Sequence, residues 1–387
     1  MNIVKLKNKE ERRIQRGHPW IFSNELEKIP ALTPGELVEV QDHAGRFIGR
    51  GYLNPRTLIA VRILSREQEE IDGAFFRAKI AAARALREQL GFGDSFRAVY
   101  SEGDGLPGLI VDKYGDTLVV QSSTAGIERL LSDFIIPALQ DVYSPETIVL
   151  KNDSASRELE GLSRETRVVL GAVSGPVLFE ECGIKYRVDV LEGQKTGFFF
   201  DQRENRLALK DLVKGRRTLD CFCYVGAWSL NAARFGAVDV VGIDSSQKAV
   251  DLAAANASLN HLPARFVAAD VFDELRRLEK ERERFGCIVL DPPAFVKSRA
   301  KVREALKGYK EINLRAMKLL EPGGVLVTCS CSHHIDQELF REMLIDAAHS
   351  AGRQARLLEM RSQARDHPMV LAARETQYLK CAVLVID

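Results

Sequence analysis

The sequence lacks any apolar run near the ~18 residues that a membrane-spanning helix needs, so we do not expect this chain to be an integral membrane protein. It also lacks a CxxC pair, and its seven cysteines are odd in number and irregularly spaced, which argues against a disulfide framework and a zinc ribbon. Its start, MNIVKLKNKEERR, is charged where a signal peptide is apolar. These absences predict a cytoplasmic chain with free thiols and no metal site.

An excess of one charge is also missing, because the formal net charge is only +1. Residues 1–66 differ from the rest, with twelve Lys and Arg against seven Asp and Glu. A locally basic segment attracts phosphates and so favours a nucleic acid partner. A solvated face near the terminus explains the same charge equally well.

The 387 residues are enough for two or three domains. The pattern of residues 1–70 predicts short strands in GELVEV, RFIGRGYLNP and LIAVRIL. Gly49 and Gly51 are expected to break the second of these strands. Residues 71–180 predict a small α+β domain that opens with an amphipathic helix from Asp72 and carries no catalytic pattern. In residues 181–387 strands alternate with helices, which predicts an α/β domain with a doubly wound, mostly parallel sheet.

Ligands of such a sheet bind beyond the carboxyl ends of its strands. Strand TLDCFC runs into a turn marked by one glycine, Gly226, and the GxGxxG pattern of dinucleotide binders is absent. Asp244 follows Asp220 by 24 residues and ends the next strand, where a carboxylate suits the ribose hydroxyls. Asp270 ends the third strand and is placed to accept from an adenine amine, although such an aspartate is more often a helix cap. Adenosine without a pyrophosphate indicates S-adenosylmethionine.

The motifs LDCFCYVGAWSL, VVGIDSS, AAANASLN, AADVF, LDPPAF and TCSCSHH resemble those of class I S-adenosylmethionine-dependent methyltransferases, whose sheet is Rossmann-like. The start of the chain, with GHPWIF and GRGYLNP, resembles the PUA fold, a β-barrel of RNA-modifying enzymes. Together with LEGQKTGFFFDQRENR, the whole chain resembles the large-subunit (23S) rRNA cytosine-carbon-5 methyltransferase family, whose members suggest a homodimer. The resemblance implies that Arg203 or Lys195 pairs with the cofactor's carboxylate. It assigns cofactor binding to Thr196, Asp220, Phe222, Gly226, Asp244, Asn256, Asp270 and Asp291.

LDPPAF resembles the motif that holds the target base in such enzymes. Its two prolines stiffen the chain after a strand, so that Asp291 can point at the cytosine edge and Phe295 can stack on the base. A rigid turn with a buried phenylalanine is the alternative. Ala294 stands where amino-group methyltransferases place an aromatic residue, which disfavours amine methylation.

TCSCSHH supplies the nucleophile that carbon-5 chemistry requires, because carbon-5 of a pyrimidine attacks only after a thiolate has added to carbon-6. Cys329 and Cys331 are two residues apart, so an extended strand places both on one side. Cys331 lies nearer the carboxyl end and is favoured, while Cys329 stays open. His333 and His334 are candidates for tuning the thiol. The remaining cysteines are expected in the core: Cys182, Cys221, Cys223, Cys287 and Cys381.

These patterns predict an enzyme that methylates cytosine carbon-5 in 23S rRNA through a cysteine adduct. One alternative is an exocyclic-amine (guanine N2) rRNA methyltransferase, which needs no cysteine. Another is an RNA-binding protein of the same fold that has lost catalysis.

Overall fold

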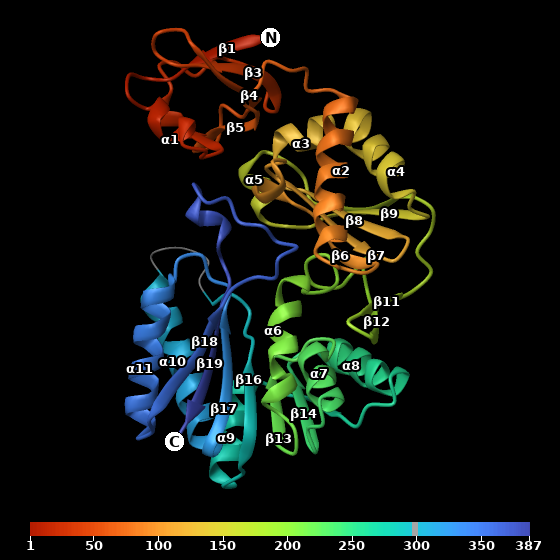
Figure 1. Ribbon diagram of the computed structural model, residues 1–387, viewed down its shortest axis with the longest axis vertical. Coiled ribbons are helices and arrows are strands. Elements are labelled where there is room, and N and C mark those ends of the chain that lie inside the picture. Colours follow the sequence, from red (N-terminus) through yellow and green to blue (C-terminus); the bar gives the residue numbers. More distant parts are fainter. Residues whose placement is uncertain (296–300) are drawn as a thin grey trace. The chain divides into compact units, whose positions relative to one another are not determined.

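A computed structural model describes residues 1–295 and 301–387 (Figure 1). Its contacts divide the chain into two compact units, each built from separate stretches of sequence. The first unit holds residues 1–180, 188–200 and 365–376, and the second holds 181–187, 201–364 and 377–387. Within the described ranges, no helix is long and apolar enough to cross a membrane.

The N-terminal part of the first unit is a five-stranded sheet with strand order β1-β3-β4-β5-β2. β3 and β5 are the strands predicted from GELVEV and LIAVRIL, and a core of small and branched apolar side chains packs with this sheet. The elements are β1 (Asn2–Lys5), α1 (Glu11–Gln15), β2 (Trp20–Phe22), β3 (Glu36–Gln41), β4 (Phe47–Leu53) and β5 (Ile59–Ser65).

The two glycines expected to break a strand instead lie inside β4. A Cβ on Gly49 would lie 2.6 Å from the carbonyl oxygen of Ser65, and one on Gly51 would lie 2.1 Å from that of Arg62. The prediction of a break was therefore wrong. These glycines permit the backbone of β5 to approach, because no side chain fits between the strands.

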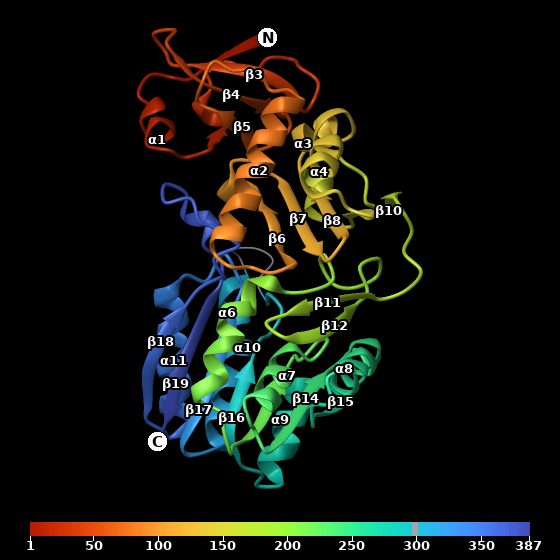
Figure 2. The ribbon, with the colours of Figure 1, turned by 45° about the vertical axis from the view of Figure 1, so that its right-hand side comes forward.

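The second sheet of the first unit has the order β10-β9-β8-β7-β6 and is packed with helices α2 to α4 (Figure 2). The predicted helix begins where expected, since Asp72 caps α2 by accepting from the backbone N–H of Phe75 at 3.0 Å. The elements are α2 (Gly73–Gln89), β6 (Ser95–Tyr100), β7 (Leu109–Tyr114), β8 (Thr117–Ser122), α3 (Ala125–Leu130), α4 (Ile136–Tyr143), β9 (Thr147–Asn152), α5 (Ser156–Leu159) and β10 (Glu165–Leu170), followed by the two-stranded sheet of β11 (Val177–Glu181) and β12 (Ile184–Val188).

The second unit contains a seven-stranded sheet with the order β15-β14-β13-β16-β17-β19-β18 (Figure 1). Its first five strands are parallel, and β19 runs antiparallel to both of its neighbours. This is the predicted doubly wound, mostly parallel sheet. The elements are α6 (Arg203–Leu207), β13 (Arg217–Cys221), α7 (Ala227–Arg234), β14 (Asp239–Asp244), α8 (Gln247–Leu259), β15 (Arg265–Ala268), α9 (Val271–Lys280), β16 (Phe285–Leu290), α10 (Val302–Leu319), β17 (Leu320–Ser330), α11 (Gln337–Ala351), β18 (Ala355–Arg361) and β19 (Lys380–Ile386).

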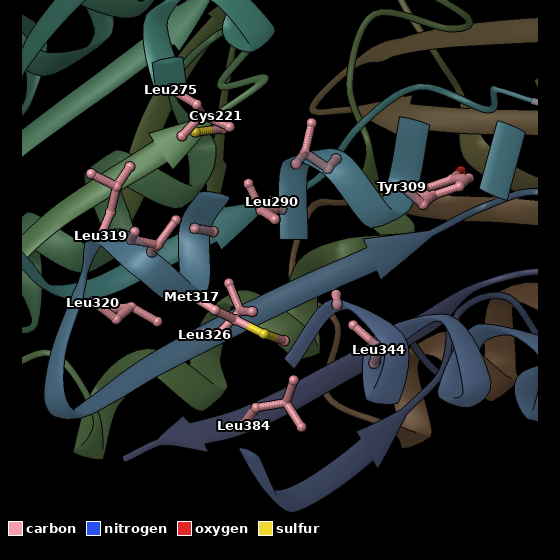
Figure 3. Packing of buried hydrophobic residues seen from close by; sticks show 14 of the residues in the cluster. Cys221, Leu275, Leu290, Tyr309, Met317, Leu319, Leu320, Leu326, Leu344 and Leu384 are labelled. Carbon is pink, nitrogen blue, oxygen red and sulfur yellow. The ribbon is translucent and has the colours of Figure 1, made fainter. Parts of the chain in front are cut away.

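Two apolar layers cover the two faces of this sheet. Helices α9, α10 and α11 pack on one face against strand residues such as Leu290, Leu326 and Leu384 (Figure 3). Helix α7 packs on the other face against Val289, Val327 and their neighbours. Because both faces of the central strands β13, β16 and β17 are buried, their polar groups can meet a ligand only at the strand ends.

Candidate functional site

The turn between β13 and α7 lies at the carboxyl edge of the sheet and has an unusual backbone conformation. Phe222, Tyr224 and Gly226 all have positive φ, at 65°, 48° and 84°. A Cβ on Gly226 would lie 3.0 Å from the ring of Phe266 and 3.1 Å from the Cβ of Ala253. The single glycine of the motif is therefore required by both conformation and space.

Two predicted aspartates flank this turn on neighbouring strands. Cys221 pairs with Ile243 on one side and with Leu290 on the other, so Asp244 and Asp291 both lie level with Phe222. The carboxylate of Asp244 accepts from the backbone N–H groups of Tyr224 at 3.0 Å and Ser246 at 2.9 Å. These bonds hold the turn and fix the direction of the carboxylate.

Asp220 lies one step deeper in β13 and is fully buried. One carboxylate oxygen accepts from the N–H and the hydroxyl of Ser229 in α7, at 2.9 and 2.6 Å. Its other oxygen, Oδ1, is buried and accepts no hydrogen bond from the described residues. The pKa of Asp220 is raised to about 7, chiefly by burial and also by the charges of Asp291 and Asp244, while the bonds to Ser229 oppose the shift.

Asp291 is held by two side chains that the sequence analysis missed. Gln202 Nε2 donates to Oδ1 and Trp228 Nε1 donates to Oδ2, both at 2.9 Å. Burial raises the pKa of this carboxyl to about 6, although the Trp228 bond lowers it. No spacing pattern connects these residues, because Gln202 and Trp228 lie 89 and 63 positions from Asp291.

The structure separates the two candidate cysteines. Cys329 lies in β17 level with Asp291, faces Cys381 across the ladder and is fully buried in the α7-side core. Burial raises the pKa of its thiol well above the ordinary value, and the neighbouring Cys381 adds to this. β17 ends at Ser330, so Cys331 lies beyond the strand and is half-buried. The expectation that one extended strand carries both cysteines was therefore wrong.

Of the five cysteines expected in the core, four are buried, but Cys182 is exposed. It occupies the turn between β11 and β12 with φ of 50°, and a turn offers no core to enter.

Three other predicted cofactor residues make structural contacts. Asn256 is fully buried and bonds the backbone of Arg187 and Val225, which supports the turn after β13. Asp270 caps α9 by accepting from the N–H of Asp273 at 3.1 Å. Thr196 belongs to the first unit, where its hydroxyl donates to Asp112. Their predicted contacts with a cofactor stay predictions.

The remaining candidate residues are an aromatic side chain, two histidines and an arginine. Phe295 packs against Phe222, Phe272 and Tyr309, with a centroid separation of 4.6 Å to Tyr309, which favours a packing role. His333 and His334 are exposed. The guanidinium of Arg203 pairs with Glu181 at 3.0 Å.

Comparison with known proteins gives two family matches. Residues 4–66 match the model of a PUA-like domain, and residues 151–373 match that of an S-adenosylmethionine-dependent methyltransferase. The chain is 40% identical over 380 residues to "Ribosomal RNA large subunit methyltransferase I" of Photobacterium profundum, with 96% of each chain covered. It is 42% identical to the protein of the same name from Aeromonas hydrophila, with 97% of this chain and 96% of that one covered.

Two solved structures share the fold along their whole length. One is a putative SAM-dependent methyltransferase from Streptococcus mutans, with a TM-score of 0.85, and the other is SMU.776, a putative methyltransferase complexed with SAH, with a TM-score of 0.86. Each is 21% identical, and each alignment covers 100% of both chains.

Proposed function

The chain belongs to the S-adenosylmethionine-dependent methyltransferase family of these relatives, and from that premise we propose that it methylates cytosine carbon-5 in large-subunit (23S) rRNA through an adduct to Cys331. The cofactor is S-adenosylmethionine, and the protein is an enzyme with a PUA-like domain and a methyltransferase domain. The ribosomal substrate is inferred from the name that the relatives carry. A homodimer belongs to the same proposal, on the resemblance alone.

The residues at the sheet edge fit this cofactor. Three carboxylates lie close enough for the charges of Asp291 and Asp244 to act on Asp220. A bound cation offsets such repulsion, and the cofactor carries a sulfonium. The turn at Gly226 has no second glycine to admit a pyrophosphate, whereas an adenosine needs none.

The proposed chemistry assigns one task to each residue. When bound, the cofactor supplies an electrophilic methyl group. The Cys331 thiolate adds to carbon-6 of the cytosine, and the electron pair of the C5–C6 double bond becomes the nucleophile at carbon-5. Carbon-5 takes the methyl, a base removes its proton, and the double bond re-forms as the Cys331 sulfur leaves with the bonding electrons. Asp291, oriented by Gln202 and Trp228, holds the edge of the base.

The position of Cys331 is the observation that carries the proposal. An attacking thiol must meet a base that has been turned out of its stack, so it must lie beyond the strand ends and be reachable. Cys331 is half-buried just past β17, whereas Cys329 is fully buried among valines and cysteines.

The test uses a 23S rRNA transcript carrying 5-fluorocytidine, incubated with the full-length enzyme and S-adenosylmethionine. Fluorine does not leave as a proton does, so the covalent adduct accumulates and is visible as a shifted band on a denaturing gel. Cys331→Ser should abolish this band, and the matched variant Cys329→Ser should retain it.

Retention in Cys331→Ser with loss in Cys329→Ser would transfer the attack to Cys329. Absence of any adduct, with the methyl group recovered on an exocyclic amine by nucleoside mass spectrometry, would establish the amine chemistry instead.

A further inference from the structure

Lys380 is a buried lysine to which neither the sequence motifs nor the proposed reaction assigns a role. It is the first residue of β19, and only 6% of it is exposed. It lies directly opposite Ser330, the last residue of β17, so the two side chains share one face of the sheet. Cys331 follows Ser330 immediately. A buried lysine needs a reason, because burying an unpaired charge is costly.

The hydrogen bonds of Lys380 join it to the backbone around Cys331. Its Nζ donates to the carbonyl oxygen of Ser332 and to that of Tyr378, both at 2.7 Å. The side chain of Ser332 is held separately, since its hydroxyl lies 3.1 Å from that of the fully buried Tyr309. The residue after Cys331 is therefore fixed at its carbonyl by a charged group and at its side chain by a neutral one.

The two carbonyls engage two of the three N–H groups of the ammonium. Among the described residues, the third donates to no protein atom. The titratable groups that act electrostatically on Lys380 are Cys331 and Asp336, the N-cap of α11. Burial lowers the pKa of Lys380 to about 8, and the electrostatic interactions with Cys331 and Asp336 oppose this fall.

We propose that Lys380 is the positioning residue that fixes the Cys331 segment and stabilises the Cys331 thiolate by its charge. An ammonium beside a thiol favours the thiolate, which is the form that attacks carbon-6. The inference rests on the proposed function for its purpose. Removing this charge makes the Cys331 thiol harder to deprotonate, whatever the substrate of the enzyme.

The experiment measures the pH dependence of Cys331 alkylation by iodoacetamide, a neutral reagent, in the full-length protein without RNA or cofactor. Peptide mass spectrometry follows Cys331 and the exposed Cys182 in the same sample, so Cys182 is an internal reference. In Lys380→Met the midpoint of the Cys331 profile should move to higher pH, with roughly three- to tenfold slower alkylation at pH 7. The plateau rate at high pH reports access to the thiol and should change little.

Two variants separate charge from anchoring. Lys380→Arg retains the charge and should keep the midpoint near that of the parent protein. Tyr309→Phe removes the neutral anchor of Ser332 and should leave the midpoint in place. An unchanged midpoint in Lys380→Met overturns the inference, and so does an equal shift in Tyr309→Phe. A lower plateau with an unmoved midpoint means that Lys380 only shapes the segment and also overturns the charge role.

This outcome is independent of the RNA adduct. A shifted midpoint together with no 5-fluorocytidine adduct would contradict the proposed function while leaving the Lys380–Cys331 coupling intact. An adduct together with an unmoved midpoint would support the proposed function and contradict the Lys380–Cys331 coupling.

Discussion

Asp220 and Asp244 lie on neighbouring parallel strands near their carboxyl ends, yet the structure gives their carboxylates different surroundings. Asp220 is fully buried against Ser229, and burial raises its pKa to about 7. Asp244 accepts two backbone N–H bonds beside the positive-φ turn and lies at the edge of the sheet. A carboxylate that is held in one direction near the carboxyl edge of the sheet can accept hydrogen bonds from ribose hydroxyls. A carboxylate that lies deeper in the strand can instead bind a helix, as Asp220 binds α7.

Asp244→Ala should weaken S-adenosylmethionine binding roughly tenfold or more, because losing a charged hydrogen bond costs ~1.5–3 kcal/mol. Titration calorimetry measures the change. Asp239→Ala is the matched control, since Asp239 begins the strand that Asp244 ends and pairs with Arg217. Unchanged affinity in Asp244→Ala would remove this residue from the site.

At the scale of elements, β4 and β17 show how a strand's neighbours decide its limits. Gly49 and Gly51 keep β4 continuous because β5 passes where a Cβ would lie. β17 ends at Ser330, opposite Lys380, and this end leaves Cys331 outside the ladder. The continuity of β4 and the end of β17 therefore depend on the partner strand rather than on the residues of the strand itself.

Gly51→Ala should lower the stability of the N-terminal sheet by about 1–3 kcal/mol, because the new methyl group would overlap the Arg62 carbonyl. Thermal unfolding followed by circular dichroism would report a lower first transition. Gly93→Ala is the control in the same unit, since a Cβ there meets nothing within 4 Å. Equal transition temperatures for the two variants would show that β5 moves aside without cost.

At the scale of the whole molecule, the PUA-like region shares a core with the domain that follows it. Tyr52 and Leu64 belong to the apolar cluster of the second sheet, and the hydroxyl of Tyr52 donates to the Pro107 carbonyl at 2.7 Å. Arg62 pairs with Glu160 at 2.9 Å. Deleting the first domain would therefore expose this cluster, so substitutions of surface charge are the cleaner test of RNA binding.

Arg12 and Arg16 are exposed and, in the part of the chain that the structure describes, form no ion pair. The double change Arg12→Glu and Arg16→Glu should weaken binding of a 23S rRNA transcript and flatten its salt dependence, because each lost phosphate contact reduces the counterions released. Filter binding across a salt series measures both effects. Arg341→Glu, at an exposed site on α11, controls for a charge reversal outside the basic segment. An equal dependence of affinity on salt in the parent protein, the double variant and the control would show that the basic segment does not bind the RNA phosphates.

Local sequence patterns predicted the elements of the methyltransferase sheet and the order of the acids near its strand ends. Alternating apolar strands and helices are local signals, and they place Asp220, Asp244, Asp270 and Asp291 within two residues of the ends of their strands. The single-glycine turn at Gly226 was equally readable, because its conformation is local.

Contacts between distant parts of the chain determine which groups surround these acids and which thiol is reachable. Gln202 and Trp228 meet Asp291 from distant positions, and Lys380 meets the Cys331 segment from 48 residues beyond Ser332. Cys329 and Cys331 have the same residue type and nearly the same neighbours in sequence, but one is fully buried and the other is not. Burial depends on the elements that pack from elsewhere in the chain, and spacing along one strand carries no record of them.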